Sequence, residues 1–462
     1  MTKLKDFGIT ILGLTLTRYR TLMIVFVNLF FGSSGIALGK PLVELVDGKL
    51  LWPHQVVLPN GGGTRVVLYS RALALSKWVE HAEITRTTSY ADDIGDGTLI
   101  AVKNKLLGCG EEKGKPVKFL YILRENLIGG PGKTLETRKK VWRITVLQST
   151  DDFARRWTFH STVTSHGNSE AGLWSPFLLE LNDGTLQAYY DDELTPHQVF
   201  GSNSSGPGNF SGHQWATMKT FVPYNSKESD PKKHCTWKDP VSVSRTMNNE
   251  VLARDGMVSV VQIGNSDTLV ATLESVDLEK IPAGVDVVSP YRGAVRIVRS
   301  EDRGKTWNFA QGREVLYSPE RRSNKRRYNG SVECSYYPVN AKFNAFQPWL
   351  TKLRDQSLLV VFATDEDEEC PGETSTDNFS LTAKFMRSFD GGITWSPLSL
   401  SNPMDKKVAW KRNPVSASPK NIWVPGVMQR RNGTVIINYI DRNKEAFGLT
   451  EIDVGPFIKI SQ

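Results

Sequence analysis

The sequence has few of the residues that build metal centres, and it lacks the patterns of a helical protein. Its cysteines, at positions 109, 235, 334 and 370, form no Cys-x-x-Cys pair and no Cys/His pair at metal-ligand spacing. The acidic run at residues 365–369 lacks the spaced-ligand loop of a calcium site. No long segment has the 3.6-residue hydrophobic period of an amphipathic helix. We therefore expect no metal site, no cofactor and no helical bundle.

Long apolar runs are also scarce, and the one near the N-terminus, residues 22–31, is too short to span a bilayer. Basic residues precede it and small residues follow it, as in a secretory signal. We predict that residues 1–37 are a signal peptide and residues 38–462 a single secreted domain without stable membrane insertion. Retention of the segment as a membrane anchor is the alternative.

Two further features agree with passage through a secretory pathway. Asn-x-Ser/Thr sequons, the acceptors for N-linked glycans, occur at Asn203, Asn209, Asn329, Asn378 and Asn432. In an oxidising compartment the four cysteines become candidate disulfides, with three possible pairings.

The net charge of +8 comes largely from basic clusters, at residues 113–118, 138–140 and 321–327. No aromatic residues interleave with them in the manner of a nucleic-acid interface, so nucleic acid is not an expected partner. We interpret them as solvated loop charges. Attraction to a polyanionic matrix such as pectin is the alternative.

One short pattern recurs five times: an extended apolar run, a tight polar turn and a second extended run. The Thr or Ser of the turn falls at Thr98, Thr185, Thr268, Ser357 and Thr434, a repeat of roughly 80 residues. Asx-Gly turns between β-branched flanks are typical of β-hairpins. In the first copy, residues 69–75 reach the turn at residues 96–98 only after an insertion at residues 76–95. Repeated hairpins of this kind predict an all-β fold with radially arranged sheets, a β-propeller.

In four copies the second strand ends at an acidic residue. The start of the first strand and the end of the second lie side by side, so a radial array brings these positions to one rim of a central channel. We predict that inner strands begin at Arg71, Ser175, Asp255, Gln347 and Val424. Their partners end at residues 191–193, 274, 365–367 and 441. A ring of carboxylates predicts a catalytic mouth, unless the acids only mark where strands meet water.

A second repeat concerns the fold alone. Residues 300–307 and 388–395 both read Ser-x-Asp-x-Gly-x-Thr-Trp, the Asp-box of sialidase-like propellers, and residues 149–157 resemble a decayed copy. The Asp and Thr side chains can bond turn amides, the Gly permits a positive φ, and the Trp packs between sheets. We expect these motifs to be structural.

Four motifs in order resemble the secreted fungal exo-α-1,5-L-arabinanases of glycoside hydrolase family 93. They are Trp174-x-Pro-Phe, Tyr189-Tyr-x-Asp-Glu, Arg254-x-Gly-Met and Thr364-Asp-Glu-Asp. The resemblance covers roughly residues 45 to 455 and implies a six-bladed propeller that releases arabinobiose from linear arabinan with retention of configuration. We expect a monomer with an oligosaccharide or polysaccharide substrate. Only five hairpins are evident, so the sixth blade would combine residues near 40–70 with the C-terminal strands.

A retaining glycosidase needs two carboxyl groups roughly 5–5.5 Å apart. The resemblance places one of them at Glu274, which we predict to be the nucleophile. The other family glutamate falls at Ser175, and a serine hydroxyl is too weak an acid to protonate the leaving oxygen. Glu170, on the loop entering that strand, and Glu193, at the end of the partner strand, are the carboxyls that could replace it.

The remaining rim residues are predicted to bind substrate. Trp174 is expected to stack on a sugar face, and Tyr189 and Tyr190 point to opposite sheet faces, so at most one of them can do so. Polar contacts to the sugar are predicted from Arg71, Ser175, Asp192, Arg254, Asp255 and Asp365.

Two alternatives to an arabinanase stay open. If no carboxyl replaces the residue missing at Ser175, the protein is a degenerate propeller that binds carbohydrate. A sialidase shares the Asp-boxes and needs three converging arginines, for which Arg71, Arg254 and Arg292 are available. The sialidase Arg-Ile-Pro signature is absent, however, and no Tyr-Glu nucleophile pair can be identified.

Overall fold

The computed structural model describes residues 42–59, 62–72, 77–87, 92–104, 106, 108–128, 140–167, 171–200, 213–223, 235–245, 252–278, 293–311, 314–317, 345–364, 381–397, 422–441 and 446–452. The predicted signal peptide at residues 1–37 lies outside these residues. So do Glu170, Arg292 and Asp365. Within the described residues, no helix is both long enough and apolar enough to cross a membrane.

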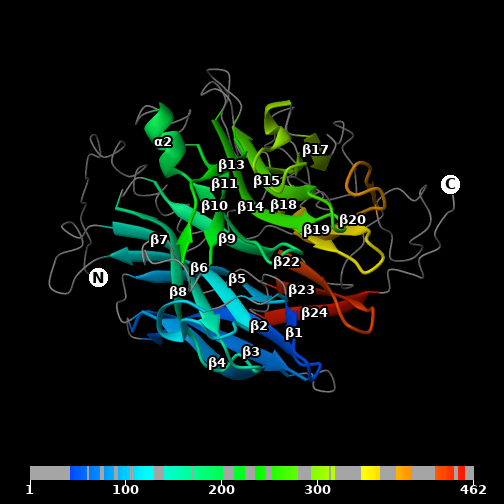
Figure 1. Cartoon of the computed structure of the whole chain (residues 1–462). Coiled ribbons are helices and arrows are strands. Elements are labelled where there is room, and N and C mark those ends of the chain that lie inside the picture. Colours follow the sequence, from blue (N-terminus) through cyan, green and yellow to red (C-terminus); the bar gives the residue numbers. More distant parts are fainter. Residues whose placement is uncertain are drawn as a thin grey trace, which may run out of the picture.

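Six antiparallel sheets follow one another along the chain, and we call them blades 1 to 6 (Figure 1). Blade 1 contains β1 (Val43–Glu44), β2 (Leu50–Val57), β3 (Thr64–Arg71) and β4 (Val79–Arg86); blade 2 contains β5 (Asp93–Ala101), β6 (Phe119–Ile128), β7 (Lys140–Ser149) and β8 (Thr158–His166); blade 3 contains β9 (Leu173–Glu180), β10 (Leu186–Asp192), β11 (Trp215–Val222), β12 (Thr236–Trp237) and β13 (Val241–Ser244). Blade 4 contains β14 (Leu252–Gln262), β15 (Leu269–Leu278), β16 (Gly293–Ser300) and β17 (Glu314–Tyr317); blade 5 contains β18 (Ala345–Lys352), β19 (Leu358–Thr364), β20 (Thr382–Ser388) and β21 (Ser396–Pro397); blade 6 contains β22 (Ile422–Gln429), β23 (Val435–Asp441) and β24 (Ala446–Ile452). The helical elements are short: α2 (Leu194–Phe200) and the 3₁₀ turns η2 (Gly110–Glu112) and η6 (Asn308–Gln311).

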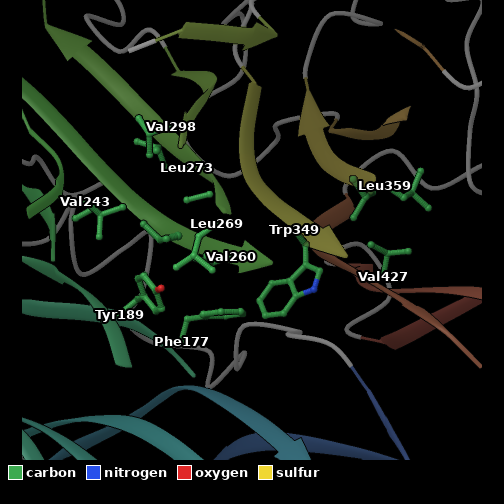
Figure 2. Close-up of a cluster of buried hydrophobic side chains, with 14 of the residues drawn as sticks. Phe177, Tyr189, Val243, Val260, Leu269, Leu273, Val298, Trp349, Leu359 and Val427 are labelled. Atoms are coloured by element: carbon green, nitrogen blue, oxygen red, sulfur yellow. The ribbon is translucent and has the colours of Figure 1, made fainter. Parts of the chain in front are cut away.

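Apolar clusters between blades hold the sheets in a ring. The largest cluster joins blades 3 to 6, where Phe177 of β9 packs against Tyr189 and Trp349 (Figure 2). Other clusters join blade 1 to blade 2 and blade 2 to blade 3. Burial of this apolar surface, at about 25 cal/mol per Å², is the main force that packs blade on blade.

The first and last blades close the ring. Trp52 of β2 is buried in one cluster with Trp423 and Ile436 of blade 6. At the turn of blade 6, the amide of Arg431 donates to the Glu44 carboxylate of β1 at 2.8 Å. Figure 1 accordingly shows β1 and β2, in blue, near β23 and β24, in red. The six-bladed β-propeller predicted from the sequence is confirmed.

The first strands of blades 2 to 6 line the axis, because β5, β9, β14, β18 and β22 contact one another in turn. Each carries a β-bulge, where the register with the second strand shifts. At each bulge one non-glycine residue has a positive φ: Asp96 (55°), Ser175 (40°), Met257 (50°), Gln347 (54°) and Val424 (48°). A bulge re-aims the backbone, and at Met257, Gln347 and Val424 the amide donates to a side chain instead of the neighbouring strand.

Two predictions about blade order were wrong. Residues 96–98 form no hairpin turn but the bulge of β5, and residues 76–95 are no insertion, because they contain β4. An Asp-Gly pair suits both structures, since a turn and a bulge each need a positive φ. Arg71 therefore ends β3 instead of starting an inner strand. The sixth blade is not mixed either: in the described residues, blade 1 uses β1–β4 alone and blade 6 uses β22–β24 alone.

The Asp-boxes are structural, as predicted. The Asp302 carboxylate accepts hydrogen bonds from the Ser300 hydroxyl and from the amide and hydroxyl of Thr306. The Trp307 indole donates to the carbonyl of Gly304, whose φ is 85°. The second box at residues 388–395 repeats these bonds. In the decayed copy, Trp157 still donates to the carbonyl at the turn, which belongs to Ala154.

One disulfide is present in the described residues. Cys109, next to η2 in blade 2, is bonded to Cys235, which precedes β12 in blade 3. This bond selects one of the three pairings that the sequence leaves open. In that pairing Cys334 and Cys370, which lie outside the described residues, would form the other pair.

Removing this disulfide should lower the free energy of unfolding by about 2–5 kcal/mol, because the bond closes a long loop in the unfolded chain. Cys109→Ala and Cys235→Ala should each lower the melting temperature, and the double variant should melt close to the single ones. Melting temperatures equal to that of the wild type would show that the bond does not form.

Candidate active site

Equivalent positions on the second strands surround the mouth of the ring. In each of blades 2 to 6, one residue of the second strand lies opposite the last first-strand residue before the bulge. From blade 2 to blade 6, these second-strand residues are Arg124, Asp191, Glu274, Ala363 and Ile440. Only two of the five are acidic, and they lie in neighbouring blades. Asp441 is one residue beyond this position, opposite Ile422. Of the predicted carboxylates, Asp191 and Glu274 occupy this position, and residues 365–367 lie outside the described residues.

The amides of three bulges bond to the preceding blade. Met257 N donates to both oxygens of Asp191 at 3.1 and 3.2 Å, and Gln347 N donates to Glu274 Oε2 at 2.8 Å. Val424 N donates to the side-chain oxygen of Gln347 at 2.7 Å. The two acids therefore satisfy backbone donors that the bulges leave without a strand partner. This arrangement links blades 3, 4, 5 and 6 near the axis.

Glu274 is a carboxyl at this mouth with a clearly raised pKa. It lies on β15 opposite Gly256 and Val295 and keeps some contact with solvent. Burial raises its pKa to about 7, although the bond from Gln347 and the charge of Arg254 act in the opposite direction. A carboxyl that titrates near neutrality in a cleft is typical of a catalytic group.

A small pocket adjoins this carboxyl. Its walls come from the bulges of blades 4, 5 and 6 and their neighbours, at Met257, Val258, Gln347, Pro348, Trp349, Val424 and Pro425. The lining is mostly apolar, and Gln347 contributes the amide that binds Glu274. The pocket therefore marks an apolar depression beside the bulge that binds Glu274.

Arg254 and Glu193, both predicted to belong to the site, form a partly buried ion pair. Arg254 Nη2 lies 2.5 Å from Glu193 Oε1 and 2.6 Å from the side-chain oxygen of Gln214. The other Glu193 oxygen accepts a hydrogen bond from Gly172 N at 2.6 Å. Both carboxylate oxygens of Glu193 are therefore engaged, which does not suit a free proton donor.

Three predicted binding residues have structural contacts instead. Asp192 accepts bonds from the amides of Leu194 and Thr195 and so caps helix α2. Asp255 has no exposed surface, and its oxygens accept from the hydroxyls of Ser244 and Ser275. Tyr190 is buried in the core between blades 2 and 3.

Trp174 and Ser175 lie at the bulge of blade 3. Trp174 is half-buried, with the guanidinium of Arg124 4.9 Å from its ring centre and Trp142 packed against it at 4.7 Å. Ser175 is buried at the bulge itself. Arg71 is partly exposed at the end of β3 in blade 1.

Sequence reasoning missed two groups at the mouth. Arg124 is buried and forms ion pairs with Asp93 and Asp96, and Gln214 binds Arg254. Because Asp96 was assigned to a hairpin turn, its pairing with Arg124 could not be foreseen. With the correct strand register, Arg124 would have been placed next to the bulge of β5. Nothing in the local sequence marks Gln214. Among the described residues, no cluster of His, Cys, Asp or Glu could hold a metal ion.

Replacing Glu274 with Gln should stabilise the protein increasingly as pH rises. The folded-state pKa is raised, so the wild type loses stability as pH climbs from about 4.5 through about 7, while the amide carries no charge. The gain in free energy of unfolding should be near zero at pH 5 and on the order of 1–3 kcal/mol at pH 8. Thermal melts at both pH values measure it, and an equal difference at both would contradict the buried, weakly acidic carboxyl.

Comparison with known proteins identifies the fold. No protein-family model matches the chain, and no curated protein matches it significantly. Among solved structures, an α-L-arabinofuranosidase from Fusarium graminearum with an iminosugar inhibitor is 14% identical, with a TM-score of 0.54 over 90% of this chain and 92% of that one. An α-L-arabinanase from Penicillium chrysogenum with arabinobiose is 14% identical, with a TM-score of 0.50 over 91% and 98%. The chain therefore has the propeller fold of the glycoside hydrolase family 93 structures and is similar to them over most of its length.

Proposed function

We propose that the protein is a secreted glycoside hydrolase that cleaves arabinan or arabinofuranosides. The observation that carries the proposal is Glu274, a carboxyl that titrates near neutrality beside a pocket at the propeller axis. The structures with the same fold support the substrate class, since two of them contain arabinobiose. Release of arabinobiose from the non-reducing end, with retention of configuration, is the finer form of the proposal and comes from the motif resemblance.

The pKa of Glu274 makes its chemical role measurable. A nucleophile must be ionised, so the rate on an aryl arabinoside with an acidic phenol would rise with pH through about 7. A general acid must be protonated, so its rate on arabinan would fall over the same range. If Glu274 is the nucleophile, as the family motif predicts, the rate on the aryl arabinoside must rise with pH.

The proposed reaction needs a second carboxyl near Glu274. Ser175 stands where the family has a glutamate, and Glu193 is bonded to Arg254 and Gly172. Glu170 lies outside the described residues. If none of these supplies a proton, the protein binds arabinan and cleaves it slowly, which is the degenerate form of the same site.

A sialidase is less well supported. Such an enzyme needs three arginines that converge on the substrate carboxylate. Arg254 is already paired with Glu193, and Arg71 ends the third strand of blade 1 instead of an inner strand. Arg292 lies outside the described residues.

Glu274→Gln should lower arabinobiose release from linear arabinan by roughly 100 to 10,000-fold, the usual contribution of a catalytic carboxyl. Asp191→Asn is the matched control, because Asp191 occupies the equivalent position one blade earlier and also binds a bulge amide. It should keep activity within about tenfold. An equal loss in both variants would show that Glu274 acts only as a link between blades.

Ser175→Glu should raise arabinan cleavage by up to roughly 100 to 10,000-fold if the missing acid is the only defect. The wild type should then be less impaired on an aryl arabinoside with an acidic leaving group, which needs little protonation. If another carboxyl already donates the proton, the added glutamate would place a like charge in the site and lower the rate. Wild-type rates on arabinan that equal those on the aryl arabinoside would rule out a lost acid.

A further inference from the structure

The charge closest in register to Glu274 belongs to Arg254 on the adjacent strand. Glu274 lies opposite Gly256, and Arg254 lies opposite Val276, two residues along β15. Diagonal neighbours of this kind on an antiparallel pair are roughly 7–8 Å apart, within reach of a long side chain. The Arg254 charge indeed acts on Glu274, in the direction that favours its ionised form.

Arg254 is held by groups from blade 3. Glu193 Oε1 and the Gln214 side-chain oxygen both accept from Arg254 Nη2, at 2.5 and 2.6 Å. Glu193 is itself fixed by Gly172, and Gln214 donates to the carbonyl of Asp255 at 3.2 Å. The side chains of Arg254 and Glu193 are 18% and 7% exposed, so water screens the pair only weakly.

We propose that Glu193 is a positioning residue for the proposed reaction: it holds the Arg254 guanidinium in place and balances its charge beside the Glu274 carboxyl. The contacts support this role better than that of a catalytic acid. A carboxylate whose two oxygens accept from Arg254 and from Gly172 has no proton to donate to a leaving group. The pair therefore spans blades 3 and 4 and couples helix α2, which follows Glu193, to the mouth of the ring.

In the described part of the chain, the other groups around Glu274 are either neutral or hold hydrogen bonds of their own. From β18 it meets the neutral Gln347, and from β16 it lies opposite Val295. The Asp255 carboxylate is bonded to two hydroxyls, and Asp191 is bonded to Met257 N. Arg254 is thus the charge through which a neighbouring residue can alter Glu274.

One more titratable group faces Glu193 itself. His166 ends β8, and burial lowers its pKa while the charges of Asp192 and Glu193 act to raise it. Because the net shift is downward, His166 is largely neutral near pH 7. Glu193 therefore has Arg254 as its main cationic partner at that pH.

Glu193→Gln leaves the Arg254 charge unbalanced, so the Glu274 carboxylate gains a stronger attraction. Its titration midpoint should move down by roughly 0.5–1.5 pH units, the range expected for a charge about 7 Å away at intermediate dielectric. Arg254→Gln removes the attraction and should move the midpoint up. In the double variant Glu193→Gln/Arg254→Gln, the two charge effects on Glu274 should partly cancel, because the two removed charges have opposite signs. A smaller effect of Glu193→Gln there than in the wild-type background would show that Glu193 also acts by holding the Arg254 guanidinium in place.

The experiment is a ¹³C NMR titration of the protein labelled at the glutamate δ-carbon, with the Glu274 resonance assigned from Glu274→Gln. Glu180→Gln is the matched control, because the Glu180 carboxylate also accepts two backbone amides but lies at the turn end of β9. It should leave the Glu274 midpoint unchanged. The pH dependence of arabinan cleavage should move with the midpoint in each variant.

The outcomes separate this inference from the proposed function. A midpoint that stays within about 0.2 pH unit in Glu193→Gln and in Arg254→Gln would overturn it. So would a roughly 100-fold fall in rate in Glu193→Gln without any shift, because that result would make Glu193 a catalytic acid. If the wild type cleaves no arabinan, the NMR titration still decides the question. If Glu193→Gln fails to fold, the upward shift in Arg254→Gln is the remaining test.

Discussion

The central constraint in this propeller is the backbone donor that the inner-strand bulges of blades 4, 5 and 6 leave without a strand partner. A bulge breaks the ladder, and an unpaired amide inside a protein costs free energy comparable to a lost hydrogen bond. At Met257, Gln347 and Val424 the donor is satisfied by a side chain of the preceding blade. The same bonds therefore satisfy the backbone, fix neighbouring blades in register, and bring carboxyl groups to the axis.

The candidate site follows from this constraint. Asp191 and Glu274 occupy the same position in consecutive blades and bind the same kind of donor, but only Glu274 keeps contact with solvent. In blades 5 and 6 the position holds Ala363 and Ile440, and Gln347 supplies the acceptor from the bulge itself. Blade 5 thus needs no acid at this position, because Gln347 already satisfies the amide of Val424.

Local patterns were enough to predict what depends on local geometry. Four hairpins and both Asp-boxes followed from the turn chemistry around residues such as Asp302 and Gly304, because their partners are close in sequence. The bulge at Asp96 was mistaken for a turn, since an Asp-Gly pair suits both. The pairing of Arg254 with Glu193 and Gln214 could not be predicted, because it depends on how two blades pack and those residues are 61 and 40 positions away.

Ser175 lies at the bulge of β9, and the other bulges show which side chains such a position accepts. Ser175 is one of five residues with a positive φ around the axis, and the others are Asp96, Met257, Gln347 and Val424. The position accepts acidic, amide and apolar side chains, because the backbone is fixed by the packing of successive inner strands. A serine at this bulge is therefore compatible with the fold. The side chain at this position can vary without loss of the propeller, whereas Glu274 accepts the bond from Gln347 N and so contributes both to the fold and to the candidate site.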